Sequence, residues 1–193
     1  MLHGMMLTLA LLLALQPEPP ARAYAGPPLA VLAQAQVAFR AHRQALGKRD
    51  VLAIVDYDRS WQDERLWILD ARTHAVRFFG HVRHAAASND ARSGRAVACS
   101  NVAGSFKSSN GAFVTERTTY EGHYGHSLRV RGLEPGVNDK ALAREIVIHP
   151  AGRLTFSAGC FMIPDEEAQQ VVDLLAGGTL LYAHGCRSAP DAP

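Results

Sequence analysis

The chain lacks any excess of one charge. Among its 193 residues, 20 are Lys or Arg and 18 are Asp or Glu, giving a formal net charge of +2. Neither sign gathers into a block or a tail, as it does in proteins that bind nucleic acids through phosphates. This balance gives no indication of nucleic acid as a partner. With 48% hydrophobic residues, the composition is typical of one folded domain.

Cysteine is scarce, with only Cys99, Cys160 and Cys186 in the whole sequence. The odd count leaves at least one thiol unpaired. In an oxidising compartment, either Cys99 pairs with Cys186 and leaves Cys160 free, or all three remain thiols. Both alternatives keep Cys160 available for chemistry.

Long apolar runs are absent except at the N-terminus, where Met5 to Leu15 are almost wholly apolar. This run is too short to cross a hydrocarbon core of about 30 Å, and small residues at Ala23 and Ala25 suit a signal-peptidase site. We expect residues 1–25 to be a cleaved signal peptide and the mature protein to be periplasmic or secreted, without stable membrane insertion. The remaining chain is expected to form one domain over 26–186 and a disordered tail over 187–193.

The hydrophobic pattern predicts a mainly β fold of the α+β class. Apolar positions at helical spacing predict one helix over residues 29–46. A second, over 164–178, has Pro and three acidic residues in its first turn and Gly-Gly at its end. Strands are predicted at 51–57, 65–70, 76–82, 111–116, 126–133, 144–150 and 179–183, with "ARTH" turning between the second and third. Residues 85–111 are predicted to form a loop that contains short strands.

The stretch "IVIHPAGRLTFSAGC" places His149 and Cys160 eleven residues apart. A cysteine attacks a carbonyl as the thiolate, so it needs a base and donors for the oxyanion. Gly159 lets the backbone turn sharply before Cys160, and His149 ends an apolar strand. By themselves these residues fit a structural role better, because a free cysteine is more often a small buried hydrophobe.

Four blocks of sequence surround this pair in a fixed order: "DVLAIVDYDRSWQDERLWILD" at 50–70, "SNVAGSFKSSNGAFVT" at 100–115, "TYEGHYGHSLRVRGLEPGVNDKALAREIVIH" at 119–149 and "GRLTFSAGC" at 152–160. Together they resemble the catalytic domain of the L,D-transpeptidases of the YkuD type, most closely the murein L,D-transpeptidase branch. The resemblance covers about residues 30 to 183.

This resemblance implies a YkuD-like β-sandwich or barrel with an N-terminal helix and one helix after the catalytic cysteine. Cys160 would be the nucleophile and His149 the base, with Ser157 and Gly159 shaping the motif and the Gly159 and Cys160 amides as oxyanion donors. The substrates would be peptidoglycan stem peptides, with no metal or other cofactor, and carbapenem-type inhibitors would add to the cysteine. An L,D-carboxypeptidase or endopeptidase using Cys160, and a non-catalytic wall-binding homologue, remain alternatives.

Several residues near the pair are candidates for binding the stem peptide, each with a structural alternative: Arg153, Tyr120, Tyr124, Ser127, Arg129 and Arg144. Guanidinium groups suit carboxylates, although exposed arginines are mostly solvated.

The link 150–152 is shorter than in the family, with Pro150 where Gly is usual. The pairs in "HVRH" and "HYGH" lack a third ligand at metal spacing, so no metal is expected. The segment "AHGC" at 183–186 is similar to the catalytic motif, but we interpret it as a match without a catalytic role.

Overall fold

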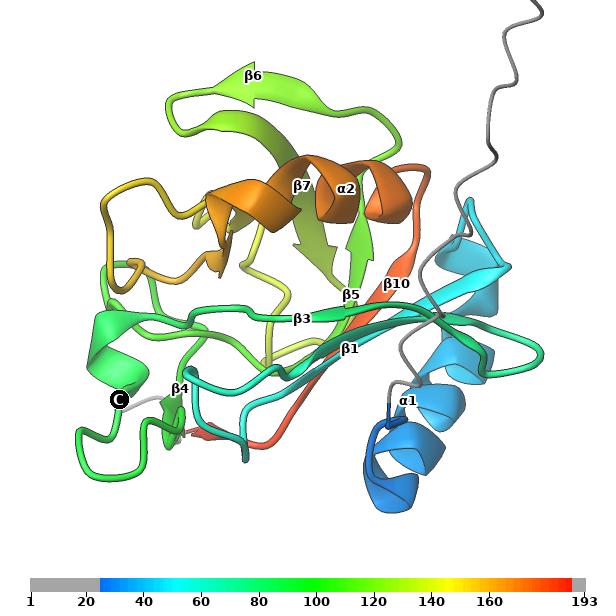
Figure 1. Ribbon diagram of the computed structural model, residues 1–193, viewed down its shortest axis with the longest axis horizontal. Helices are drawn as coiled ribbons and strands as arrows, with labels where there is room; N and C mark the ends of the chain where they lie inside the picture. The colour runs from blue at the N-terminus through cyan, green and yellow to red at the C-terminus, as the bar shows by residue number, and fades with distance from the viewer. Residues whose placement is uncertain (1–24, 189–193) are drawn as a thin grey trace, which may run out of the picture.

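The computed structural model describes residues 25–188, which form one large, strongly bent sheet, a small two-stranded sheet and two helices (Figure 1). The helices are α1 (Leu29–Ala41) and α2 (Asp165–Leu175), with 3₁₀ turns at Arg43–Ala45 and Ala86–Ser88. The strands are β1 (Val51–Asp56), β2 (Leu66–Asp70), β3 (Val76–Gly80), β4 (Ala98–Cys99), β5 (Gly111–Thr115), β6 (Tyr120–Gly122), β7 (Gly125–Gly132), β8 (Val147–Pro150), β9 (Phe161–Ile163), β10 (Leu180–His184) and β11 (Arg187–Ser188). The predicted mainly β fold with one helix before the sheet and one after Cys160 is confirmed.

The nine-stranded sheet runs in the order β3-β2-β1-β10-β5-β7-β8-β9, and β6 pairs with β7. Strand β1 lies in the interior of this sheet and all six of its residues are buried. A strand covered on both faces needs apolar side chains at successive positions, which explains the continuous run "VLAIV". The predicted hairpin at "ARTH" is also present, because β2 and β3 pair antiparallel on either side of it.

Two hydrophobic clusters lie on opposite faces of the sheet. On one face α1 packs Val31, Ala35 and Phe39 against alternate residues of β1 such as Leu52 and Ile54. On the other face the sheet curls over, so that its second half and α2 enclose the larger cluster (Figure 1). This second half, with strands β7, β8 and β9, carries His149 and leads to Cys160.

Helix α2 covers that larger cluster on the side away from the first half of the sheet (Figure 1). Its first turn, Asp165 to Glu167, places carboxylates at the positive end of the helix dipole, where negative charge is stabilising. Its buried stripe packs onto strands β7, β8 and β9. The members of the stripe are Ala168, Val171, Val172 and Leu175. These four positions recur at the three- and four-residue spacing of one helix face.

A disulfide joins Cys99 to Cys186 across 87 residues, and Cys160 is the free cysteine. The bond ties β4 to the segment after β10, where β11 pairs parallel with β4. The structure thus selects the first of the two cysteine arrangements, and Cys186 of "AHGC" is occupied by this bond. Strand β11 begins inside the expected tail, because pairing with β4 satisfies its backbone. The expected signal peptide, apart from Ala25, and residues 189–193 lie outside the described residues.

Sequence patterns do not reveal the buried polar network behind β2. Arg65 is fully buried and donates to the Val82 carbonyl (3.0 Å), the Arg59 carbonyl (2.9 Å) and His84 Nδ1 (2.7 Å). The other ring nitrogen of His84, Nε2, donates to Asn89 Oδ1 at 3.2 Å. Burial and the neighbouring Arg65 charge lower the pKa of His84 to about 4. His84 is therefore a neutral structural histidine rather than a metal ligand.

Between residues 25 and 188, no helix combines the length and the apolar character needed to cross a membrane.

Acid should weaken the fold through His84. Its folded pKa of about 4 lies below the unfolded value near 6.5, so the unfolded chain takes up the proton first as the pH falls. Stability is then lost progressively from pH 6.5 down to 4, by about 2–3 kcal/mol for this residue. We expect His84→Gln, whose amide can replace both hydrogen bonds, to unfold with a flatter pH dependence. Urea denaturation of both proteins between pH 7.5 and 4.5 measures this, and equal slopes would contradict the assignment.

Candidate functional site

Strand register places the predicted site residues on one face of the second half of the sheet. Ile148 pairs with Leu128 on β7 and with Phe161 on β9. All three side chains belong to the core cluster under α2. Because side chains alternate along a strand, the neighbouring positions point to the opposite face. His149 therefore lies on the face away from α2.

The same register brings Cys160 onto that outer face. If the pairing of β8 with β9 is extended back by one residue, Cys160 lies opposite Val147. Val147 is two positions before His149 on β8, so its side chain is on the same face as the imidazole. Strand spacing and rise put the two α carbons on the order of 8 Å apart, a diagonal that two side chains can bridge. The pair thus comes from two parallel neighbouring strands, with the nucleophile candidate at the start of β9 and the base candidate within β8.

The thiol of Cys160 is half-buried, and its pKa lies above the ordinary value. Its Sγ donates to the Glu145 carbonyl at 3.7 Å, a weak thiol hydrogen bond. Burial raises the pKa of the Cys160 thiol, while the hydrogen bond from the Val147 backbone and the Arg144 charge act in the opposite direction. The thiol therefore needs a base when it reacts.

The imidazole of His149 is held in one tautomer. Its Nδ1 lies 2.6 Å from the Pro150 carbonyl oxygen, which can only accept, so Nδ1 carries the proton and Nε2 has a free lone pair. The Tyr124 ring stacks on the imidazole with a centroid distance of 4.4 Å and helps to bury it to 1% exposure. Burial lowers the pKa of His149, so the ring is neutral at pH 7. A neutral imidazole with a free Nε2 is a base.

Ser157 shapes the turn into Cys160 through two hydrogen bonds. Its Oγ donates to the Cys160 carbonyl at 2.7 Å and accepts from the Gly159 amide at 3.1 Å. The Gly159 amide, which the resemblance implies as an oxyanion donor, is thus engaged by Ser157 Oγ in this structure. The roles of the Gly159 and Cys160 amides as oxyanion donors stay predictions.

Gly159 is required at its position for steric reasons. Its φ is +152°, and a Cβ there would lie 2.6 Å from Ile146 Cδ1. The same Cβ would be 3.3 Å from Arg144 Nη2. Any side chain would push the turn away from these neighbours.

The register also places three of the substrate-binding candidates on the outer face. Tyr120 pairs with Ser127, which continues the row toward His149. Arg129 pairs with Val147 and holds its guanidinium 3.9 Å from the Tyr120 ring centroid. The Ser127 hydroxyl donates to the Gly125 carbonyl at 2.7 Å, so in this structure it satisfies the local backbone.

The two other arginine candidates differ sharply. Arg153 lies exposed in the turn after β8. Arg144, by contrast, donates to four protein oxygens from its two terminal nitrogens. It is therefore not free to bind a substrate carboxylate. Sequence reasoning missed this role, because the acceptors belong to a loop about forty residues earlier in the chain.

The short link after His149 borders an open groove of about 540 Å³. Gly152 at the end of this link donates its amide to Asp165 Oδ1 at 2.8 Å, which ties the link to the start of α2. Trp61 and Arg83 line the groove with Gly152 and Asp165. Neither His149, Ser157 nor Cys160 lines this groove, which lies beside the link and the first turn of α2.

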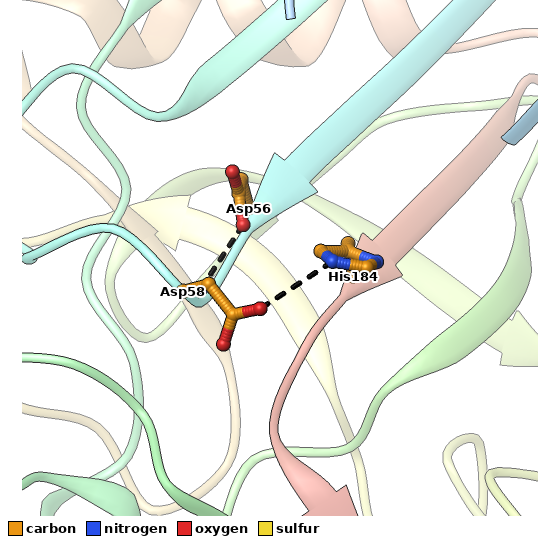
Figure 2. A group of neighbouring side chains, drawn as sticks. All are labelled: Asp56, Asp58 and His184. Atoms are coloured by element: carbon orange, nitrogen blue, oxygen red, sulfur yellow. Dashed lines mark hydrogen bonds and ion pairs between the residues drawn. The ribbon is translucent and has the colours of Figure 1, made fainter. Parts of the chain in front are cut away.

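One group in the described part of the chain brings three potential metal ligands together, namely Asp56, Asp58 and His184 (Figure 2). They lie at the ends of β1 and β10, away from β8 and β9. Asp58 Oδ1 is 3.6 Å from the Arg95 guanidinium and its Oδ2 is 3.4 Å from His184 Nε2. Asp56 accepts from the Asp58 amide at 3.0 Å. Protein groups thus already neutralise Asp58, and we assign no metal to this cluster.

A family model described as the L,D-transpeptidase catalytic domain matches residues 27–184. A search of curated protein sequences gives no significant match.

Among solved structures, the helical cell shape determining protein Pgp2 from Campylobacter jejuni aligns with a TM-score of 0.49 and 14% identity, over 83% of this chain and 58% of that one. An L,D-transpeptidase from Stackebrandtia nassauensis aligns with a TM-score of 0.44 and 13% identity, over 70% and 55%. The Ldtfm-avibactam carbamoyl enzyme gives 0.43 and 13%, over 72% and 50%. The present chain spans little more than half the length of these proteins. From the match of the family model, the chain belongs to the L,D-transpeptidase catalytic-domain family.

Proposed function

We propose that this protein is a peptidoglycan L,D-transpeptidase with Cys160 as its nucleophile. The observation that carries the proposal is the shared outer face of β8 and β9, where a free thiol lies diagonal to an imidazole of fixed tautomer. The proposed substrate is a tetrapeptide stem that ends in D-alanine attached to a diamino acid, and membership of the L,D-transpeptidase catalytic-domain family supports a peptidoglycan substrate.

The reaction begins from two neutral groups. His149 Nε2 takes the proton of Cys160 Sγ as the sulfur attacks the carbonyl at the L centre of the diamino acid. The oxyanion that forms accepts from the Cys160 amide, and such a donor typically contributes about 10²–10³ in rate. The C–N bond then breaks, His149 returns its proton to the leaving D-alanine nitrogen, and a thioester remains on Cys160.

The second half of the reaction reverses these roles. The side-chain amine of a second stem attacks the thioester carbonyl and loses a proton to His149 Nε2. The C–S bond breaks, and the thiolate of Cys160 recovers that proton. The new amide is a 3–3 cross-link between two stems.

A hydrolase with the same nucleophile is the second candidate, favoured by the short 150–152 link directly after the base candidate His149. Water entering there would resolve the thioester and release a shortened stem. In this reading the protein is an L,D-carboxypeptidase or endopeptidase. The third reading is a wall-binding homologue without catalysis.

Incubation with purified disaccharide-tetrapeptides distinguishes these functions. We expect a cross-linked dimer together with free D-alanine, whereas hydrolysis gives shortened monomers and no dimer. Cys160→Ala should lose activity by about 10³-fold or more because no thioester can form. His149→Gln should lose about 10²–10⁴-fold because the general base is gone. His42→Gln, at the end of α1, is the matched control and should keep wild-type activity. Muropeptide chromatography that shows no Cys160-dependent product would reject both enzymatic functions.

A carbapenem should acylate the same thiol. Cys160 Sγ adds to the lactam carbonyl and the lactam C–N bond opens without a leaving group. The mass of the protein therefore rises by that of the whole inhibitor. We expect this adduct in intact mass spectrometry of the wild type and none for Cys160→Ser under the same conditions. An adduct of equal yield on both proteins would show that another group reacts.

We also propose export to the periplasm or cell surface. The apolar run and small residues of 1–25 support a cleaved leader, and the Cys99–Cys186 disulfide is typical of oxidising compartments. Expressed with its own N-terminus in a bacterial host, the protein should be recovered from the envelope fraction beginning at Gly26. One thiol should titrate before reduction and three after it. A full-length cytosolic chain with three thiols would contradict export.

A further inference from the structure

Arg144 closes the loop of residues 100–109 onto the turn that contains the nucleophile. Its Nη1 donates to the Ser100 carbonyl and to Ser109 Oγ, both at 2.6 Å. Its Nη2 donates to the Lys107 carbonyl at 2.7 Å and lies 3.4 Å from Ser105 Oγ. Four contacts from one planar group hold the loop in a single geometry, which a lysine with its one ammonium cannot reproduce.

The guanidinium reaches the turn before Cys160. The position of a Cβ on Gly159 would be 3.3 Å from Arg144 Nη2 and 3.4 Å from the Lys107 carbonyl oxygen, so both groups close onto the glycine. Glu145, the next residue after Arg144, has a left-handed backbone with φ of 55°, and its carbonyl accepts from Cys160 Sγ. Two successive residues thus contact the nucleophile and the glycine before it.

All four acceptors of Arg144 are neutral. They are two backbone carbonyls and two serine hydroxyls, and no carboxylate between residues 25 and 188 forms an ion pair with the guanidinium. No ion pair therefore neutralises the guanidinium, whereas the charge of the neighbouring Glu145 carboxylate acts on the Cys160 thiol in the opposite direction and raises its pKa. Arg144 is also half-buried, where water screens a charge less than at the surface.

We propose that Arg144 is a positioning residue that holds loop 100–109 against Gly159 and Cys160, and whose charge stabilises the Cys160 thiolate. When Sγ loses its proton, the thiol of Cys160 becomes an anion beside a fixed cation. An opposite charge within a few ångströms favours the charged form. The importance of this thiolate for catalysis rests on the proposed function, but its stabilisation does not.

Alkylation of Cys160 by iodoacetamide as a function of pH tests the proposal without any peptidoglycan substrate. Cys99 and Cys186 are bonded to each other, so Cys160 is the one thiol that reacts. Arg144→Gln removes the charge and should raise the apparent pKa of the thiol by about one unit, which slows alkylation about tenfold at neutral pH. Arg144→Lys keeps the charge and should retain a pKa near that of the wild type, although its loop contacts and Tm decrease.

A purely structural role predicts a different pattern. If Arg144→Gln and Arg144→Lys lower the Tm and leave the thiol pKa of both proteins at the wild-type value, the electrostatic part of the proposal is wrong. If neither variant lowers the Tm, the positioning part is wrong.

A second pair of variants covers the case in which Arg144→Gln does not fold. Ser105→Asp places a carboxylate beside Nη2 with Arg144 present and should raise the thiol pKa, while Ser105→Asn should not. Equal pKa values for these two proteins would overturn the electrostatic part. If Ser105→Asp raises the thiol pKa but the wild-type protein makes no cross-links, the electrostatic role of Arg144 is supported and only the transpeptidase function is rejected.

Discussion

The site depends on the inward packing of Ile148. This side chain lies in the core between the bent sheet and α2, level with Leu128 and Phe161 on the neighbouring strands. Because β8 alternates, burying Ile148 fixes His149 on the other face, and a slip of one residue would bury the imidazole under the helix instead. The hydrophobic contact therefore determines which side of the sheet carries the chemistry.

Burial then sets the protonation states of the pair. The imidazole of His149 is buried and the thiol of Cys160 is half-buried, and this partial removal from water disfavours the charged form of each. The resting site is neutral rather than a preformed thiolate and imidazolium. Stabilising groups are arranged around the charge that develops later: the Cys160 amide for the oxyanion and, in our proposal, Arg144 for the thiolate. The Tyr124 ring completes the arrangement by shielding the base.

The loop of residues 100–109 connects this site to the disulfide. Cys99 is bonded to Cys186, and the carbonyl of the next residue, Ser100, accepts from Arg144. The covalent bond and the guanidinium therefore hold adjacent positions of the same segment. On the other side, the short link after His149 is held by a hydrogen bond from the Ala151 amide to the Ile163 carbonyl and by one from the Gly152 amide to Asp165. Different interactions therefore hold the segments next to the two members of the pair.

Much of this could be predicted from local sequence. The strand at Ile148, the buried stripe of α2 and the "ARTH" hairpin follow from hydrophobic period and turn chemistry, which act over a few residues. The family resemblance pointed to His149 and Cys160. The network of Arg65 with His84 could not be found this way, since its partners come from segments that pattern reading treats separately.

The sequence by itself determined the mainly β fold, the two helices and the identity of the candidate pair. Only the tertiary structure decided that the amide of Gly159 is already engaged by Ser157, that Arg144 serves the loop rather than a substrate, and that Cys99 pairs with Cys186. The physical reason is the range of the forces involved. Period and propensity are local, whereas a hydrogen bond or disulfide depends on which distant segments the packed core brings within a few ångströms.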